Sequence, residues 1–132
     1  MPKPARPRVL LADDHVEVLA ALQRLLEPSC DIIGRATDGT ALLEAAQALE
    51  PDVIVLDMFL PAIDGLEACR RIRQARPETK VVLLTAADGP AFRERAFEVG
   101  ASAFLSKLSQ VDQLVPAILR AFAGETDGIP ES

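Results

Sequence analysis

The sequence predicts one α/β domain with a parallel five-stranded sheet and helices on both of its faces, and three observations support this prediction. Short apolar runs alternate along the chain with segments whose apolar residues recur at helical spacing. Four of the runs are continuously apolar, which is typical of strands buried on both faces of a parallel sheet. The 132 residues are the length of a single domain. Right-handed crossovers between the strands then give a doubly wound (βα)5 architecture.

The strands are expected at the apolar runs, and four of these runs stop at a reactive polar side chain. The first stops at Asp13-Asp14, the third at Asp57, the fourth at Thr85 and the fifth at Lys107. The second run is a weaker strand signal. The predicted strands cover residues 9–12, 31–36, 53–56, 81–84 and 103–106.

The helices are expected between these strands, where capping residues, glycine and proline mark their ends. The last helix contains Pro116, which we expect to bend the helix or to distort its first turn. The third carries Arg70, Arg71 and Arg76 on its outer face, which we interpret as solvated. The predicted helices run from after Asp14 to Pro28, from Asp38 or Thr40 to Pro51, from Gly65 to Pro77, from Pro90 to Val99, and from Gln110 to Ala123.

Composition and the chain ends limit the classes of function. Residues 1–7 are expected to form a disordered N-terminal arm, residues 8–124 the domain, and residues 125–132 a tail or the start of a linker to an output domain. The net charge of −6 argues against direct binding of nucleic acid by this chain. No apolar stretch reaches the roughly 20 residues of a membrane span. Cys30 and Cys69 lack metal-ligand spacing, and we expect free thiols in a reducing cytoplasm.

The polar residues that end the strands are expected to meet at one edge of the sheet. For five such units the flavodoxin-like strand order 2-1-3-4-5 is the natural expectation, with the topological switch point between the first and third strands. Asp13, Asp14, Asp57, Thr85 and Lys107 would then share one pocket. An accidental set of helix-capping acids would not need to place all of them on the same edge.

Such a pocket has a definite chemistry. Carboxylates at about 4 Å repel by roughly 4 kcal/mol per pair at an effective dielectric of 20, so a cation must offset them. Oxygen ligands without histidine or thiolate suit Mg²⁺. Together with Lys107, the cation would neutralise a transferring phosphoryl group while Asp57 attacks it in line. Asp13 and Asp14 would hold the metal.

The chain resembles the receiver domain of two-component response regulators over residues 8–124, and most closely the NarL/FixJ-type regulators that have LuxR-type outputs. The resemblance is carried by the segments 10–15, 53–65, 83–86 and 100–107, and above all by the combination of Asp13-Asp14, Asp57, Pro61, Asp64-Gly65 and Lys107.

The resemblance implies a role for each of these positions. Asp57 is expected to accept a phosphoryl group from a phosphohistidine of a sensor histidine kinase, and Lys107 to contact that group. Thr85 and Phe104 are expected to face outward without phosphate and to turn inward with it. The expected ligands of Mg²⁺ (or Mn²⁺) are Asp13, Asp14, Asp57 and the backbone carbonyl of Phe59.

The resemblance also implies a role in the cell. We expect a cytoplasmic signalling domain rather than an enzyme, although one with intrinsic self-phosphorylation and self-dephosphorylation chemistry. Phosphorylation would change the surface of the domain and so control an output, for which we expect transcription. A homodimer on phosphorylation is expected by resemblance only, and DNA would be contacted only through an output domain that this chain does not contain.

Some positions depart from the family pattern or have more than one reading. Leu108 stands where many receivers have a proline, so a trans bond and a more mobile loop are expected. Met58 and Phe59 are expected to face solvent at the pocket mouth. His15 lacks the helical-bundle context of a phosphorylated histidine, so that role is disfavoured.

The sequence disfavours three other functions relative to a receiver domain. A haloacid-dehalogenase-type phosphatase would need a second carboxylate where Phe59 stands. A flavodoxin would need a hydroxyl- and glycine-rich loop where Asp13-Asp14-His15 stands. A receiver fold kept only for protein interaction would not need all of the site positions intact.

Overall fold

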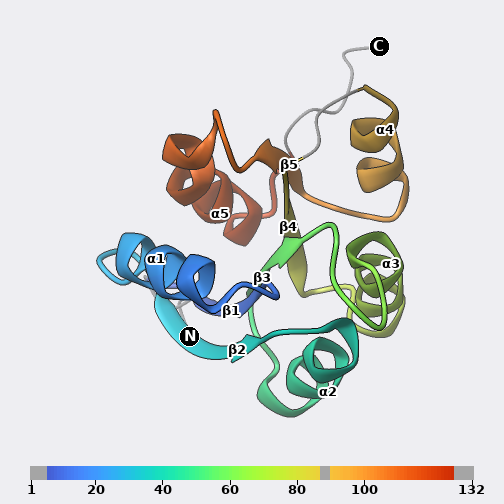
Figure 1. Cartoon of the computed structure of the whole chain (residues 1–132), viewed down its shortest axis with the longest axis horizontal. Coiled ribbons are helices and arrows are strands. Elements are labelled where there is room, and N and C mark those ends of the chain that lie inside the picture. The colour runs from blue at the N-terminus through green and yellow to red at the C-terminus, as the bar shows by residue number, and fades with distance from the viewer. Residues whose placement is uncertain (1–5, 87–89, 127–132) are drawn as a thin grey trace.

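A computed structural model of the chain describes residues 6–86 and 90–126, in which strands and helices alternate in the predicted order (Figure 1). The strands are β1 (Arg8–Ala12), β2 (Asp31–Ala36), β3 (Val53–Asp57), β4 (Lys80–Thr85) and β5 (Ala103–Ser106). The helices are α1 (Val16–Leu26), α2 (Gly39–Leu49), α3 (Gly65–Ala75), α4 (Pro90–Glu98) and α5 (Leu114–Phe122), with a 3-10 turn at Val111–Gln113.

The sheet has the predicted order, β2-β1-β3-β4-β5, and all of its neighbouring strands are parallel. Figure 1 shows α1 and α5 on one face of the sheet and α2, α3 and α4 on the other. Because both faces are covered, the apolar residues form two core clusters, one on each side. Every residue of the central strand β3 is buried, which explains its continuously apolar sequence.

The strand register brings the carboxyl ends of the central strands level with one another. Asp57 at the end of β3 pairs with Leu84, and Thr85 at the end of β4 pairs with Ser106. Ala12, the last residue of β1, pairs with Leu56. The residues that follow these strands therefore emerge at one edge, as the sequence predicts.

Two helices begin at an aspartate whose side chain caps the first turn. The Ala41 amide donates to Asp38 Oδ1 at 2.7 Å at the start of α2, and the Glu67 amide donates to Asp64 Oδ1 at 2.9 Å at the start of α3. Asp38, and not Thr40, is therefore the cap of α2. Helix α1 differs, because its capping position is occupied by His15, whose side chain makes no capping hydrogen bond.

The last helix begins later than predicted. Residues 111–113 form a 3-10 turn and the α-helix starts at Leu114, so Pro116 lies in the first helical turn and not in the interior. Proline is tolerated there because the amide groups of a first turn have no partner within the helix. Of the two expected effects of Pro116, the structure has the distorted start.

Residues 6 and 7 of the predicted N-terminal arm contact the domain. The Arg6 guanidinium donates to the carbonyl oxygens of Glu27, at 2.6 Å, and of Cys30, at 2.9 Å, and it pairs with Asp31 at 2.9 Å. These carbonyls lie at and beyond the carboxyl end of α1, which favours a cation. Pro7 is buried, and residues 1–5 lie outside the described residues. Of the predicted tail, residues 125–132, only residues 125 and 126 belong to the described part of the chain.

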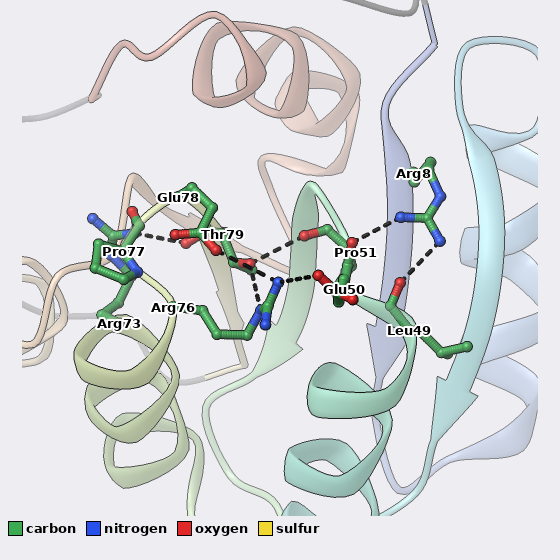
Figure 2. A network of polar contacts seen from close by, with 9 residues as sticks. All are labelled: Arg8, Leu49, Glu50, Pro51, Arg73, Arg76, Pro77, Glu78 and Thr79. Atoms are coloured by element: carbon green, nitrogen blue, oxygen red, sulfur yellow. Dashed lines mark hydrogen bonds and ion pairs between the residues drawn. The ribbon is translucent and has the colours of Figure 1, made fainter.

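Figure 2 shows a network of arginines at the opposite edge of the sheet, where the strands begin. The Arg76 guanidinium pairs with Glu50 at 3.2 Å, and its Nε donates to the Thr79 hydroxyl at 3.4 Å. That hydroxyl donates to the Pro51 carbonyl at 3.1 Å. The Arg8 guanidinium donates to the Glu50 carbonyl at 2.7 Å, where the chain turns back with a positive φ.

This network corrects one prediction about α3. Arg76 is turned toward the protein, with 22% of its side chain exposed, and so does not belong to a freely solvated face. Arg70 and Arg71 do lie on the surface, where they both pair with Glu67. Their hydrogen bonds lower the pKa of the Glu67 carboxyl to about 2.

Within residues 6–86 and 90–126, none of the helices combines the length and the apolar character needed to cross a lipid bilayer.

Candidate functional site

The side chain of Lys107 joins two of the predicted carboxylates at the carboxyl edge of the sheet. Its ammonium lies 2.5 Å from Asp13 Oδ2 and 3.3 Å from Asp57 Oδ2. Asp13 follows β1, Asp57 ends β3 and Lys107 follows β5, so strands from distant parts of the sequence supply the three groups. The predicted convergence of these residues is confirmed by these distances.

Both carboxylates are buried, and this environment changes the pKa of the Asp57 carboxyl. Asp13 is 1% exposed and Asp57 is 6% exposed. Burial is the largest influence on Asp57 and raises the pKa of its carboxyl, and the nearby Asp13 charge adds to this. The Lys107 charge and the Phe59 amide, which donates to Asp57 Oδ1 at 3.3 Å, oppose that shift only in part. The pocket therefore needs positive charge to keep both acids ionised.

The contacts of Lys107 with the two acids favour the charged form of its side chain. Burial, the largest single influence, disfavours its charge, but the hydrogen bond from the ammonium to Asp13 and the charges of Asp57 and Asp13 outweigh it, so its pKa is raised. The loop that carries Lys107 is fixed on both sides. The Ser106 amide donates to the Gln110 side-chain oxygen at 2.9 Å, and the Leu108 amide donates to the Ser106 hydroxyl at 3.2 Å.

The peptide bond before Leu108 is trans, as predicted, because the described residues contain no cis peptide bond. The Leu108 side chain itself is 82% exposed beside Lys107.

The segment after Asp57 is fixed by backbone contacts. The Met58 amide donates to the Leu84 carbonyl at 2.8 Å, which extends the strand pairing by one residue. The Gly65 amide then donates to the Met58 carbonyl at 2.8 Å, so the start of α3 lies directly against the end of β3. A Cβ at Gly65 would lie 2.4 Å from the Asp57 carbonyl oxygen, so this approach requires glycine.

The prediction that Met58 and Phe59 both face solvent is wrong for Met58 and agrees with the structure for Phe59. Met58 is 1% exposed and belongs to the core cluster on the α2, α3 and α4 side, because the extended pairing turns its side chain inward. Phe59 is 49% exposed, and its ring packs edge-on against Phe92 of α4 with centroids 6.0 Å apart.

Asp13, Asp14 and His15 form a cluster with metal-ligand spacing. One ligand atom from each of the three residues lies within 4.8 Å of the others. Asp14 is exposed to solvent over 35% of its side chain, so the cluster is open to a cation from solution. Two carboxylates with hard oxygen donors fit a divalent cation such as Mg²⁺, which keeps several water ligands of its own.

The two predicted switch residues are buried. Thr85 is 0% exposed and its carbonyl accepts a hydrogen bond from the Lys107 amide at 2.9 Å. Phe104 is 5% exposed and belongs to the core cluster with Ala96 and Ala101. Of the two arrangements in the switching prediction, the structure therefore has the inward one for Phe104, because its ring fills apolar space beneath α4.

Sequence reasoning missed two contributors to this site. The sequence analysis considers His15 only as a phosphorylated residue, yet its imidazole lies beside both acids. Its position directly after the acid pair is the signal for this role in the sequence. Ser106 was treated only as part of a strand, yet its hydroxyl accepts hydrogen bonds in the loop that positions Lys107. A small hydroxyl residue at the end of a buried strand carries no signal of that role.

Comparisons with known proteins agree with this geometry. The model of the response regulator receiver domain family matches residues 9–119. The response regulator GacA of Pseudomonas aeruginosa is 34% identical over 120 residues, which cover 89% of this chain and 56% of GacA. The probable transcriptional regulatory protein NarL of Mycobacterium tuberculosis is 36% identical over 125 residues, which cover 93% of this chain and 58% of NarL. The chain thus spans a little over half the length of these relatives.

A solved structure shows the same fold. The signal receiver domain of the putative response regulator NarL from Mycobacterium tuberculosis superimposes with a TM-score of 0.85 at 35% sequence identity, over 92% of this chain and all of that domain. The family match also decides against the flavodoxin and haloacid-dehalogenase alternatives. With its parallel sheet in the order 2-1-3-4-5 and its acidic pocket, the chain belongs to the receiver domains of two-component response regulators, of the NarL/LuxR and GacA type.

Proposed function

We propose that Asp57 is the phosphoacceptor of this receiver domain, and that it takes its phosphoryl group from a sensor histidine kinase. The observation that supports this most is the position of the Lys107 ammonium, 3.3 Å from Asp57 Oδ2 and 2.5 Å from Asp13 Oδ2. This cation lies beside the nucleophile, where the oxygens of an incoming phosphoryl group would carry negative charge.

In the transfer step, a carboxylate oxygen of Asp57 attacks phosphorus and forms the new P–O bond. The bond from phosphorus to the imidazole nitrogen of the donor breaks, and that nitrogen keeps the electron pair. Asp57 must be ionised to attack, and Lys107 favours its charged form against the effect of burial. The Phe59 amide, 3.3 Å from Asp57 Oδ1, holds the carboxylate in one orientation.

Asp13 and Asp14 would hold the Mg²⁺ (or Mn²⁺) that the transfer needs, with Asp57 and the Phe59 carbonyl as the further proposed ligands. The cation would neutralise charge on the transferred phosphoryl oxygens. Asp13 serves two groups from its two oxygens, because Lys107 contacts Oδ2 and Oδ1 faces His15. Asp13 is almost completely buried, which keeps each of its two oxygens directed at its own partner.

Phosphorylation would then be read through Thr85 and Phe104. The added group carries nearly two negative charges and strong acceptor oxygens. Thr85, at the end of β4, would donate to it, and Phe104 would be held in its buried position beneath α4.

The output that we propose is control of transcription. This is supported by relatives that are named as transcriptional regulators and are longer than this chain. DNA would be contacted by an output domain, consistent with the net charge of −6 on the chain described here. Dimerisation on phosphorylation is part of the same proposal.

The decisive experiment is incubation with acetyl phosphate and Mg²⁺, followed by intact mass spectrometry. We expect the mass to rise by that of one phosphoryl group, and a chelator or the substitution Asp57→Asn to abolish the rise. Asp64→Asn is the matched control, because Asp64 is an exposed carboxylate nearby that only caps α3. An unchanged mass of the folded wild-type chain would instead support a receiver fold kept for protein interaction alone.

A further inference from the structure

The imidazole of His15 faces two carboxylates and makes no capping hydrogen bond to α1. Its Nδ1 lies 3.2 Å from Asp13 Oδ1 and 3.1 Å from Asp14 Oδ1. Ligand atoms bound at about 2.1 Å to one octahedral cation are separated by about 3 Å. His15 Nδ1 therefore already lies at this spacing from one oxygen of each acid, and one ligand atom from each of the three residues lies within 4.8 Å of the others.

The surrounding contacts direct Asp13 Oδ1 and Asp14 Oδ1 toward the Nδ1 atom of His15. Asp13 is occupied by Lys107 at Oδ2, so only Oδ1 faces the imidazole. The His15 amide donates to that same Oδ1 at 2.9 Å, which fixes the carboxylate relative to the imidazole. His15 stands at the capping position of α1, yet its side chain turns back to the acids and leaves the helix amides uncapped.

We infer that His15 is a third side-chain ligand of the cation site, and that through its Nδ1 the site takes late first-row metal ions such as Zn²⁺ as well as Mg²⁺. An imidazole nitrogen adds much to the binding of Zn²⁺ and little to that of Mg²⁺, which prefers oxygen ligands and water. This inference rests on the proposed function only in taking Asp13 and Asp14 as the cation site. It adds a nitrogen donor and a second class of metal ion, which would compete with Mg²⁺.

His15 is the single histidine of the sequence, so its ring nitrogens can be followed without ambiguity in a tag-free chain labelled with ¹⁵N-histidine. On addition of Zn²⁺ we expect the Nδ1 resonance to move to a metal-bound position while Nε2 keeps its proton. Mg²⁺ should not produce this change. Movement of Nε2 in place of Nδ1, or no movement, would overturn the inference.

Binding affinities give the second readout. We expect His15→Asn to weaken Zn²⁺ by at least about tenfold, the lower end of the loss caused by removing a supporting partner of a metal site. Mg²⁺ should change by less than about twofold. Glu17→Gln is the matched control, because it removes an exposed carboxylate from the first turn of α1 outside the cluster. Equal Zn²⁺ affinity in the His15→Asn and wild-type chains would mean that the imidazole is only a hydrogen-bond partner of the acids.

The phosphorylation test keeps the two proposals apart. If acetyl phosphate modifies Asp57 but Zn²⁺ does not move Nδ1, the role of His15 fails and the phosphoacceptor role stands. If Nδ1 binds Zn²⁺ but Asp57 takes no phosphoryl group, the metal site stands and the phosphoacceptor role fails.

Discussion

Individual side chains of the acidic pocket are held in place by contacts with backbone groups and with charged side chains. Lys107 lies between Asp13 and Asp57, and its removal would leave two buried carboxylates without their shared cation. The segment between Asp57 and α3 is set by a glycine that allows two backbone stretches to approach. We therefore expect the pocket to tolerate few substitutions at these residues.

Gly65→Ala should destabilise the protein by roughly 1–3 kcal/mol, the usual cost of forcing atoms into a packed site. The new Cβ would lie 2.4 Å from the Asp57 carbonyl and 2.6 Å from Met58 Cα, and both are backbone atoms that cannot move independently. Urea denaturation measures the change in the free energy of unfolding.

Gly34→Ala is the matched control for that substitution. Its Cβ would meet only the ends of the Leu49 and Leu10 side chains, at 2.9 and 3.2 Å, which can shift. A cost at Gly34 as large as that at Gly65 would contradict the explanation from backbone contact.

The two free cysteines should be unreactive in the folded protein. Burial raises the pKa of the Cys69 thiol to about 12 and also raises the pKa of Cys30, and both side chains are at most 1% exposed. Since the thiolate is the reactive form, Ellman's reagent at pH 8 should label neither native thiol and both unfolded ones. Rapid labelling of the native chain would show that the core opens locally.

At the scale of the element, the start of α5 is decided by Pro116. A 3-10 turn over residues 111–113 precedes the α-helix, and the proline falls in its first turn. The same residue in the interior would remove a hydrogen bond and clash with the preceding turn. The position of the helix start is therefore a property that substitutions can test.

Pro116→Ala should lower the free energy of unfolding by less than about 1 kcal/mol, an effect that comes mainly from a more flexible unfolded chain. Leu119→Pro, on an exposed interior position of the same helix, should cost about 3 kcal/mol or more. Thermal and chemical denaturation compare the two variants. A large loss in Pro116→Ala would mean that the proline has a packing role beyond the helix start.

At the scale of the whole molecule, the sheet divides the core into two clusters that share no buried residue. Ile54 of β3 packs on the side of α2, α3 and α4, and Ile118 of α5 packs on the other side. Both side chains are fully buried. The two faces therefore contribute to stability through separate sets of contacts.

Ile54→Val and Ile118→Val should each cost about 0.5–1.5 kcal/mol, the usual effect of removing one buried methylene. The double variant should lose the sum of the two to within about 0.5 kcal/mol, because the residues lie on opposite faces of the sheet. Denaturant unfolding of the single and double variants measures this. A clear departure from additivity would show that the two clusters repack together.

Much of this architecture and of the pocket follows from local sequence. Continuous apolar runs that end in Asp57 or Thr85 predict parallel strands, and the edge rule for such sheets predicts that their last residues meet. The sequence does not choose between Asp38 and Thr40 as the start of α2, because both residues can cap a helix and only the backbone geometry selects one. The sequence does not predict the burial of Met58, because the hydrogen bond from its amide to the Leu84 carbonyl depends on the neighbouring strand.

By itself, the sequence determined the order of strands and helices, the family, and the set of residues at the carboxyl edge, since periodicity and the positions of polar residues are local properties. Only the tertiary structure decided which atoms touch: that Lys107 contacts Asp13 more closely than Asp57, that Phe104 lies buried, and that the imidazole of His15 faces both acids. The physical reason is that side-chain contacts between distant segments depend on register, packing and charge balance, which no single segment contains.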